Sequence, residues 1–231
     1  MGNFIFPPLC IICNTPLSTQ NEWLCITCLD SLHHNSTNRN ACPKCSQNLD
    51  LRFCTCELAW DFSFDKIHSV YDFSETIRSA AHLIKYKGKG KLAYQLGLLS
   101  GKVIPKQLLG QCDICIPVPL HSSRERQRGY NQSELFARGI IDSGDFKLQI
   151  ECNLLLRNRK TGTQTKLDRT ERAKNLTGAF SVPSEKGGVL KNKAVLLVDD
   201  IVTTGATTEA CATALMECNC ASVTVLSLAR D

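Results

Sequence analysis

Long apolar segments are missing from this sequence, and so are the usual marks of export. No apolar run approaches the roughly 18 residues that a membrane-spanning helix needs. The first residues lack the basic stretch and the small-residue cleavage site of a secretion signal. Gly2 follows Met1, but Phe6 stands where a myristoylation signal carries Ser or Thr. We therefore expect a cytoplasmic protein with no membrane span and no lipid anchor.

A strong net charge is also missing. The formal charge is +5, which is too small to indicate a polyanionic partner by itself. Its distribution is more informative, because residues 1–56 carry three basic and three acidic side chains, whereas residues 121–175 carry twelve and seven. The basic excess of the middle segment favours an anionic ligand there, although a solvated surface of mixed charge is the commoner explanation.

Cysteine, in contrast, is abundant, and eight of the fourteen cysteines stand in residues 10–56 as four close pairs. Each short turn places two thiolates on one side of a tetrahedron, and a second turn completes a closed, structural zinc site. A segment this short could not hold a core alone, so metal would supply much of its folding free energy. The expected zinc ligands are Cys10, Cys13, Cys25, Cys28, Cys42, Cys45, Cys54 and Cys56.

The sequence leaves the arrangement of these ligands open. They can pair consecutively along the chain, or the first and third turns can share one metal. A disulfide framework fits poorly with the expected cytoplasmic location, and an iron–sulfur cluster is a weaker alternative. His33 and His34 lie between the two sets of cysteines. We expect both at the surface, because eight thiolates already fill two tetrahedra.

The central motif is the run VLLVDDIVTTGAT, from Val195 to Thr207. Its apolar residues are typical of a strand buried on both faces, which we expect to end at Asp199 and Asp200. A small, hydroxyl-rich turn follows, and then a helix over 208–217. The first N–H groups of that helix, its dipole and the Thr hydroxyls form a site for one phosphate monoester. The residues of this phosphate loop are Thr203, Thr204, Gly205, Ala206 and Thr207.

The two acids beside the phosphate loop have a different role. Carboxylates repel a phosphate, but they accept hydrogen bonds from the vicinal hydroxyls of a ribose that carries it. The local chemistry therefore indicates ribose 5-phosphate. A strand end with an ordinary Thr-capped helix explains the run less well, because neither needs two acids together with Thr-Thr-Gly.

Hydrophobic periodicity predicts the other elements. We expect strands at 67–73, 112–118, 179–182 and 221–229, and helices at 75–86 and 92–103. Trp60, Phe62 and Phe64 alternate with polar residues where the cysteine pattern stops. The sequence therefore predicts a small domain over 1–60 and a larger one over 61–231.

Three polar segments are candidates for binding anions. The first is a lysine loop that suits a DNA backbone or a pyrophosphate, although a solvated turn is equally expected. The second, which follows the strand at 112–118, is an arginine-rich loop suited to a polyanion. The third, residues 157–175, is expected to be a mobile lid, although disorder is the common explanation of such segments. The side chains concerned are Lys85, Lys87, Lys89 and Lys91; His121, Arg124, Arg126, Arg128 and Gly129; and Arg157, Thr161 and Gln164.

Taken together, these motifs resemble the ComF family. Four cysteine turns precede PVPLH and the arginine-rich loop, and the run Val195–Thr207 matches the phosphoribosyl-pyrophosphate (PRPP) signature of type I phosphoribosyltransferases. Further matching residues are Tyr130, Asn131, Gln132, Arg169, Arg172 and Asn175. The resemblance covers essentially the whole chain. It implies an α/β fold, with a mostly parallel type I phosphoribosyltransferase sheet flanked by helices and a small N-terminal zinc-ribbon domain.

The resemblance also implies a function. PRPP would bind with Mg2+, and its pyrophosphate would be displaced from the anomeric carbon by an acceptor that the sequence does not identify. Asp199 and Asp200 would position the ribose, while Arg124, Arg128 and the lid would neutralise the leaving group. Members of this family are associated with natural competence. Uptake and handling of transforming single-stranded DNA, together with other competence proteins, are therefore implied for this chain.

Two other functions stay open at the level of sequence. The fold could serve as a non-catalytic module that binds a nucleotide or single-stranded DNA, with the lysine loop and the zinc head holding the strand. Only 6% of the residues are aromatic, so stacking platforms for bases are few. A gluconate-uptake-type accessory role, attached to some members of the family, is not distinguished from a competence role.

Overall fold

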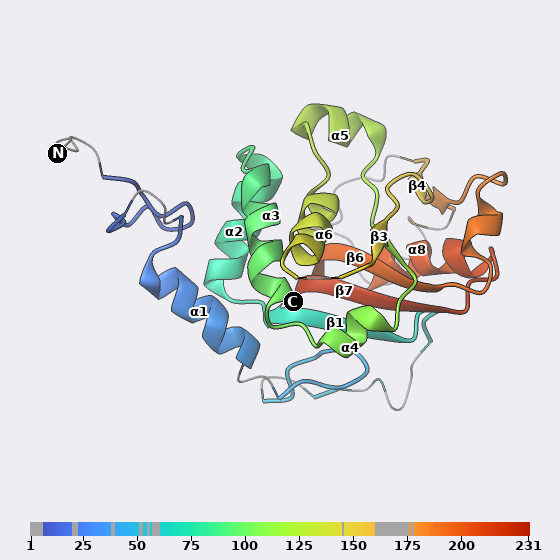
Figure 1. Cartoon of the computed structure of the whole chain (residues 1–231), viewed down its shortest axis with the longest axis horizontal. Helices are drawn as coiled ribbons and strands as arrows, with labels where there is room; N and C mark the ends of the chain where they lie inside the picture. The colour runs from blue at the N-terminus through green and yellow to red at the C-terminus, as the bar shows by residue number, and fades with distance from the viewer. Residues whose placement is uncertain are drawn as a thin grey trace.

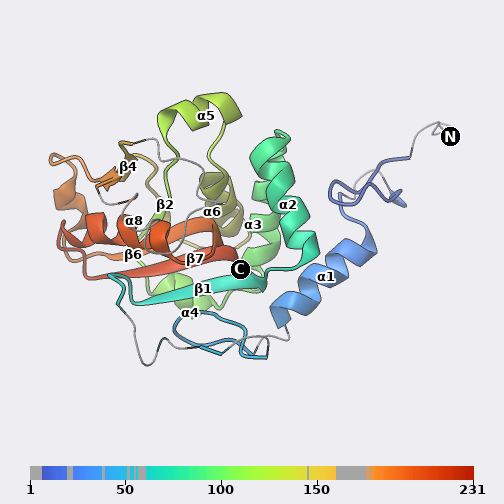
Figure 2. The ribbon, with the colours of Figure 1, turned by 180° about the vertical axis from the view of Figure 1, so that it is seen from behind.

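The computed structural model describes most of the chain (Figures 1 and 2). The described residues are 7–19, 23–37, 40–50, 53–54, 56, 61–144, 146–159, 176 and 178–231, without the side chains of 34–37. Trp60 and nearly all of the expected lid, including Thr161 and Gln164, lie outside them, as does the side chain of His34. No helix in this part of the chain is both long and apolar enough to span a bilayer.

A five-stranded, entirely parallel sheet forms the centre of the molecule, with strand order β1-β7-β6-β2-β3. Its strands are β1 (Lys66–Asp72), β2 (Ile114–Pro117), β3 (Gln149–Ile150), β6 (Ala194–Val202) and β7 (Ser222–Arg230). The inner strands β2, β6 and β7 are mostly apolar and mostly buried, as strands covered on both faces require. The α/β fold class expected from the sequence is confirmed.

Helices cover both faces of the sheet. The α-helices are α1 (Ile26–Thr37), α2 (Glu75–Tyr86), α3 (Gly90–Gly101), α4 (Lys106–Gly110), α5 (Ser122–Arg128), α6 (Gln132–Asp142) and α8 (Ala206–Met216). One core cluster lies between the sheet and α1, α2, α3 and α6, and a second lies between the sheet and α8. The second face also carries a short antiparallel ladder of β4 (Leu156–Arg157) and β5 (Phe180–Ser181), and a 3-10 turn, η2 (Gly187–Leu190).

The structure contains every strand and helix that periodicity predicted, but it corrects two expectations. The strand of the central motif does not end at Asp199 and Asp200; it continues to Val202, because pairing with β7 extends to Val202 opposite Arg230. The arginine-rich loop is largely helical. His121 caps the start of α5, and Gly129, at φ 82°, ends it in the left-handed conformation that glycine adopts without strain.

The second set of cysteines covers an edge of the sheet. In both views the chain of residues 40–50 lies along β1, below it (Figures 1 and 2). The backbone N–H of Ile67 donates to the carbonyl of Lys44 (2.8 Å). The Ser46 hydroxyl donates to the Ile67 carbonyl and accepts from the Ser69 N–H, at 3.0 Å each. These contacts satisfy backbone groups that an edge strand would otherwise leave open.

Apolar packing also joins the first set of cysteines to the main body. Leu32 of α1, Cys10 and Cys28 belong to the same buried cluster as Val70 of β1 and Ile77 of α2. The division into domains at residue 60 stays a prediction, since residues 57–60 are outside the described part of the chain.

Candidate phosphoribosyl site and metal centres

The central motif begins on β6, beside β2, and the connections that follow these two neighbouring strands lead toward opposite edges of the sheet. From β2 the chain passes through α5 and α6 to β3 on one side, and from β6 it passes through α8 to β7 on the other. The last hydrogen bond between the two strands joins the Val118 N–H to the Val198 carbonyl, at 2.8 Å. Beyond Val198 the β2 side of β6 is open. Such a crevice at the carboxyl ends of parallel strands is the usual ligand site of an open α/β sheet.

Asp199 faces this crevice from inside the protein, with 7% of its surface exposed. Its Oδ1 accepts hydrogen bonds from the Ser133 hydroxyl of α6 (3.1 Å) and from the Asp200 N–H (2.8 Å). Burial, together with the neighbouring charge of Asp200, raises the pKa of Asp199 to about 7. Near neutral pH this carboxyl group therefore exists in both protonation states.

Asp200 is held by a cation from a distant part of the chain. The Lys85 ammonium, from the last turn of α2, lies 2.7 Å from Asp200 Oδ2, and both side chains are mostly buried, at 29% and 14% exposed. Burial opposes the charge of Lys85, but Asp200 outweighs it and raises the pKa of that lysine. Asp200 is thus neutralised by a permanently charged partner.

The phosphate loop follows immediately. Asp199 and residues 201–208 line one hollow, and the lining includes the start of α8 at Ala206. Gly205, at φ 81°, is the N-cap and turns the chain into the helix. The first N–H groups of a helix have no intrahelical partner. The Ala206 N–H donates to the Thr204 hydroxyl at 3.4 Å, and the N–H groups that follow it in the first turn of α8 point toward a site where an anion can bind. Asp199 therefore lines the same hollow as the start of α8, and Asp200 is not among the residues that line it.

Residues just before β1 brace this loop. The rings of Phe62 and Phe64 stack with centroids 4.8 Å apart, and a Cβ added at Gly205 would lie 3.4 Å from the Phe62 ring. The N–H and hydroxyl of Ser63 donate to the two carboxylate oxygens of Glu209, at 2.8 and 2.7 Å. The first turn of α8 is therefore fixed from outside the loop itself.

The eight N-terminal cysteines form two separate clusters of four. In each cluster the sulfur atoms lie within 4.8 Å of one another. The members are Cys10, Cys13, Cys25 and Cys28 in the first, and Cys42, Cys45, Cys54 and Cys56 in the second. The pairing is thus consecutive along the chain and not interleaved. None of these residues forms a disulfide.

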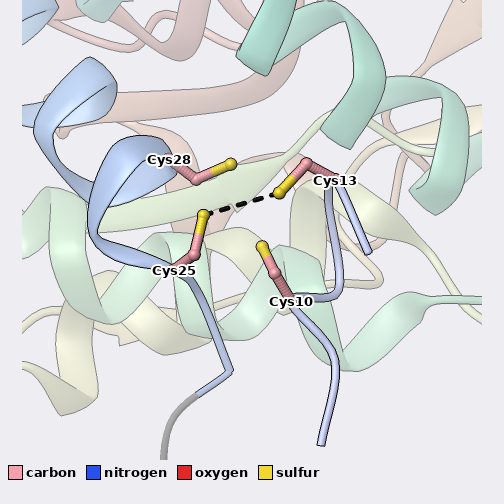
Figure 3. A group of neighbouring side chains, drawn as sticks. All are labelled: Cys10, Cys13, Cys25 and Cys28. Atoms are coloured by element: carbon pink, nitrogen blue, oxygen red, sulfur yellow. Dashed lines mark hydrogen bonds between the residues drawn. The ribbon is translucent and has the colours of Figure 1, made fainter. Parts of the chain in front are cut away.

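Figure 3 shows the first cluster, in which a turn of the chain and the start of α1 direct four sulfurs toward one point. Cys13 Sγ and Cys25 Sγ are 3.4 Å apart, close to the about 3.8 Å expected between thiolates on one tetrahedral zinc. Hydrogen bonds from Thr15 lower the pKa of Cys13 to about 6, which favours the thiolate that a metal needs. Both clusters could hold a zinc ion. His33 is exposed and belongs to neither, as expected.

Comparison with known families agrees with this geometry. A family model described as "Phosphoribosyl transferase domain" matches residues 109–231, more than half of the chain. The chain belongs to the phosphoribosyl transferase domain family. The matched segment contains β2, β6, β7 and the phosphate loop, whereas β1, α2 and α3 precede it but share the sheet and its core.

Relatives match along the whole chain. The "DNA utilization protein YhgH" of Escherichia coli (strain K12) is 28% identical over 230 residues, which covers 97% of each chain. "Competence protein F" of Haemophilus influenzae is 28% identical over 236 residues and all of both chains. "Competence protein ComFC" of Bacillus subtilis is 25% identical over 253 residues, all of this chain and 98% of that one. The resemblance to the ComF family is confirmed.

The arginine-rich segment of this phosphoribosyl transferase domain extends from the carboxyl end of β2. The Asn131 side chain donates to the Val118 carbonyl (3.1 Å) and caps α6, and Arg128 donates to Gln132. Helix α5 has no buried residue and projects from the sheet (Figure 1). Arg126 is exposed on this helix, whereas Arg124 and Arg128 are partly exposed.

Arg157 begins the expected lid and lies on β4, with its guanidinium 5.2 Å from the Phe180 ring centroid. Burial lowers the pKa of Arg157; the charge of Arg124 acts in the same direction and Asp199 opposes it. Arg157 is therefore near enough to both Arg124 and Asp199 for their charges to act on it.

The lysine loop is divided by the structure. Lys87, Lys89 and Lys91 are exposed around the start of α3, whereas Lys85 belongs to the acid pair. Sequence reasoning missed this role of Lys85, and also Ser133 and the contact between Ser63 and Glu209. No local pattern marks them, because each contact joins distant parts of the chain.

Proposed function

We propose that this chain binds PRPP, or a related 5-phosphoribosyl compound, and acts in natural competence by helping to handle transforming single-stranded DNA. The observation that carries the proposal is the crevice at β6, where buried Asp199 and the adjacent, mostly buried Asp200 precede a phosphate loop at the N-terminus of α8. The names of the full-length relatives support the link to competence and DNA utilization.

In this proposal each group has a distinct task. The phosphate loop, Thr203 to Thr207, binds the 5-phosphate, and Asp199 and Asp200 accept hydrogen bonds from the ribose hydroxyls. Arg124, Arg128 and Arg157 stabilise the pyrophosphate as negative charge develops on it. Mg2+, when bound with PRPP, would supply further positive charge to the leaving group. The chemistry that this arrangement supports is transfer of the phosphoribosyl group to an acceptor.

Calorimetry with PRPP and Mg2+ tests the proposal. The double variant Asp199→Asn, Asp200→Asn should lose PRPP binding, because amides cannot replace both ribose acceptors, while the fold is kept. Glu185→Gln with Glu217→Gln is the matched control, since both of these carboxylates are exposed and outside the crevice. Equal PRPP affinity in the double variant and the wild type would mean that the acid pair has another role.

The second proposed activity is binding of single-stranded DNA beside the crevice. Tyr86 is 67% exposed and stands next to exposed Lys87, Lys89 and Lys91. An exposed aromatic ring among cations is the combination that single-strand binders use. Affinity should fall with salt on logarithmic axes with a slope of about 0.7 for each phosphate neutralised.

A fluorescent oligonucleotide titrated at several salt concentrations, with and without PRPP and Mg2+, tests this second activity. Replacing the three exposed lysines by Gln should reduce the slope by up to about 2. The control replaces three other exposed lysines, which lie outside the lysine loop: Lys102, between α3 and α4, and Lys191 and Lys193, just before β6. No DNA binding at low salt would eliminate this activity and leave PRPP binding unaffected.

We further propose that the two cysteine clusters hold structural zinc and that the chain acts in the cytoplasm beside other competence proteins. A site of four thiolates leaves no open coordination position, so zinc would stabilise the fold and take no part in transfer.

A further inference from the structure

The ion pair between Lys85 and Asp200 stands out because it places a cation on one of the two acids proposed to bind ribose. The ammonium–carboxylate distance is 2.7 Å, and the pair is mostly shielded from solvent. A buried carboxylate that keeps its charge needs such a partner. Asp200 is therefore already paired with Lys85 before any ligand binds.

Contacts with Tyr130 fix the backbone around Lys85. The Tyr130 hydroxyl donates to the carbonyl of Ile84, the residue before Lys85, at 2.5 Å. The Tyr130 ring packs against the start of α3 so closely that a Cβ at Gly90 would lie 2.9 Å from it. The end of α2 is thus fixed beside the chain that leads into α6 and Ser133, whose hydroxyl holds Asp199.

Lys85 has a fixed backbone and a long, flexible side chain. Its ammonium can therefore contact either Asp200 or a ligand bound beside Asp200. Its ammonium is a compact charge at the end of four methylenes, and it can turn while its backbone stays in place. When ribose hydroxyls donate to Asp200, they replace the ammonium as hydrogen-bond donors. The anomeric carbon is the next ring atom after the carbon that bears the 2-hydroxyl. A diphosphate on the anomeric carbon would therefore lie within reach of the displaced ammonium.

We propose that Lys85 is a specificity-determining residue that exchanges Asp200 for the diphosphate of the ligand. This inference rests on the proposed function, since it assigns Lys85 to the same crevice. The exchange favours phosphoribosyl compounds with a diphosphate at the anomeric carbon over ribose 5-phosphate. With ribose 5-phosphate, the ammonium loses Asp200 without gaining another anion.

Calorimetry of the full chain with PRPP and with ribose 5-phosphate, each with Mg2+, tests the exchange. Lys85→Gln should weaken PRPP binding by about tenfold or more, the value of one charge-assisted hydrogen bond, and should change ribose 5-phosphate binding much less. Lys85→Arg keeps the charge and should retain the preference for PRPP. Lys193→Gln is the matched control, because that exposed lysine directly precedes β6, at the end of the strand opposite to Asp199 and Asp200.

Chemical labelling of the wild type provides a second test that does not depend on the folding of a variant. Acetylation of Lys85, followed by mass spectrometry, should be accelerated by ribose 5-phosphate and not by PRPP. The inference is overturned if Lys85→Gln weakens both ligands by the same factor, or if both ligands change the labelling rate equally. A wild-type chain that binds neither ligand overturns the proposed function itself, and the inference with it.

Discussion

At the scale of single residues, the burial of Asp199 in the crevice changes its pKa and thereby the stability of the fold. Burial and the charge of Asp200 raise its pKa to about 7, against about 3.9 for an unperturbed aspartate. The folded chain therefore keeps a proton that the unfolded chain releases near pH 4. The free energy of unfolding should fall as the pH rises from about 4 to about 7, and the full destabilisation is present above that range.

This sign leads to a prediction for Asp199→Asn. The amide keeps an acceptor for Ser133 and for the Asp200 N–H but cannot ionise, so it removes the destabilising charge. At pH 8 the variant should be more stable than the wild type by about 2 to 4 kcal/mol, and the difference should fall to about 1 kcal/mol or less at pH 4.5. Urea unfolding of both proteins at the two pH values measures it. A difference that does not change with pH would show that Asp199 does not titrate as described.

At the scale of elements, the contact between α3 and α6 sets the position of Ser133. The two helices approach at a pair of glycines: a Cβ at Gly97 would lie 2.3 Å from the Phe136 carbonyl oxygen, and one at Gly139 would lie 2.1 Å from that of Tyr94. Backbone atoms cannot move aside as a side chain can. A methyl group at either position therefore has to push the helices apart.

Gly97→Ala should accordingly lower the free energy of unfolding by about 1 to 3 kcal/mol, as overpacking of a close contact does. It should also weaken PRPP binding, because α6 carries the hydroxyl that orients Asp199. Gly110→Ala is the control, since a Cβ at Gly110 would meet nothing within 4 Å. Urea unfolding and calorimetry of the two variants give the comparison, and similar values for both would contradict this account of the helix contact.

At the scale of the whole molecule, the two cysteine clusters have different relations to the sheet. The second cluster covers β1, and Arg230 at the end of β7 donates to the carbonyl of Cys45, at 2.6 Å. The first cluster packs through apolar residues around α1. Losing the second cluster should therefore uncover a sheet edge, and losing the first should not.

We expect purified protein to contain about two zinc ions per chain, one for each set of four thiolates. Cys10→Ser and Cys42→Ser should each lose one of them. Only Cys42→Ser should also self-associate, because an uncovered edge strand pairs readily with another chain. Metal analysis and light scattering check both expectations. Preparations without zinc, or two variants with the same association state, would count against this division of roles.

Much of this architecture follows from short stretches of sequence. The eight clustered cysteines, the two adjacent acids, the segment Thr203–Thr207 and the parallel strands each belong to short contiguous patterns of sequence. Such patterns can be interpreted locally, because strand alternation, helix starts and ligand spacing depend on residues a few positions apart. The strand of the central motif was nevertheless predicted too short, since its end depends on pairing with β7.

The sequence by itself therefore determined which residues are predicted for the phosphoribosyl site and which cysteines can bind metal. Only the tertiary structure decided how they are grouped: which cysteines share a cluster, that Ser133 holds Asp199, and that Lys85 leaves the lysine loop to neutralise Asp200. The physical reason is the same in each case. These contacts join side chains that are far apart along the chain, and their distances are set by the packing of α2 and α6 on the sheet.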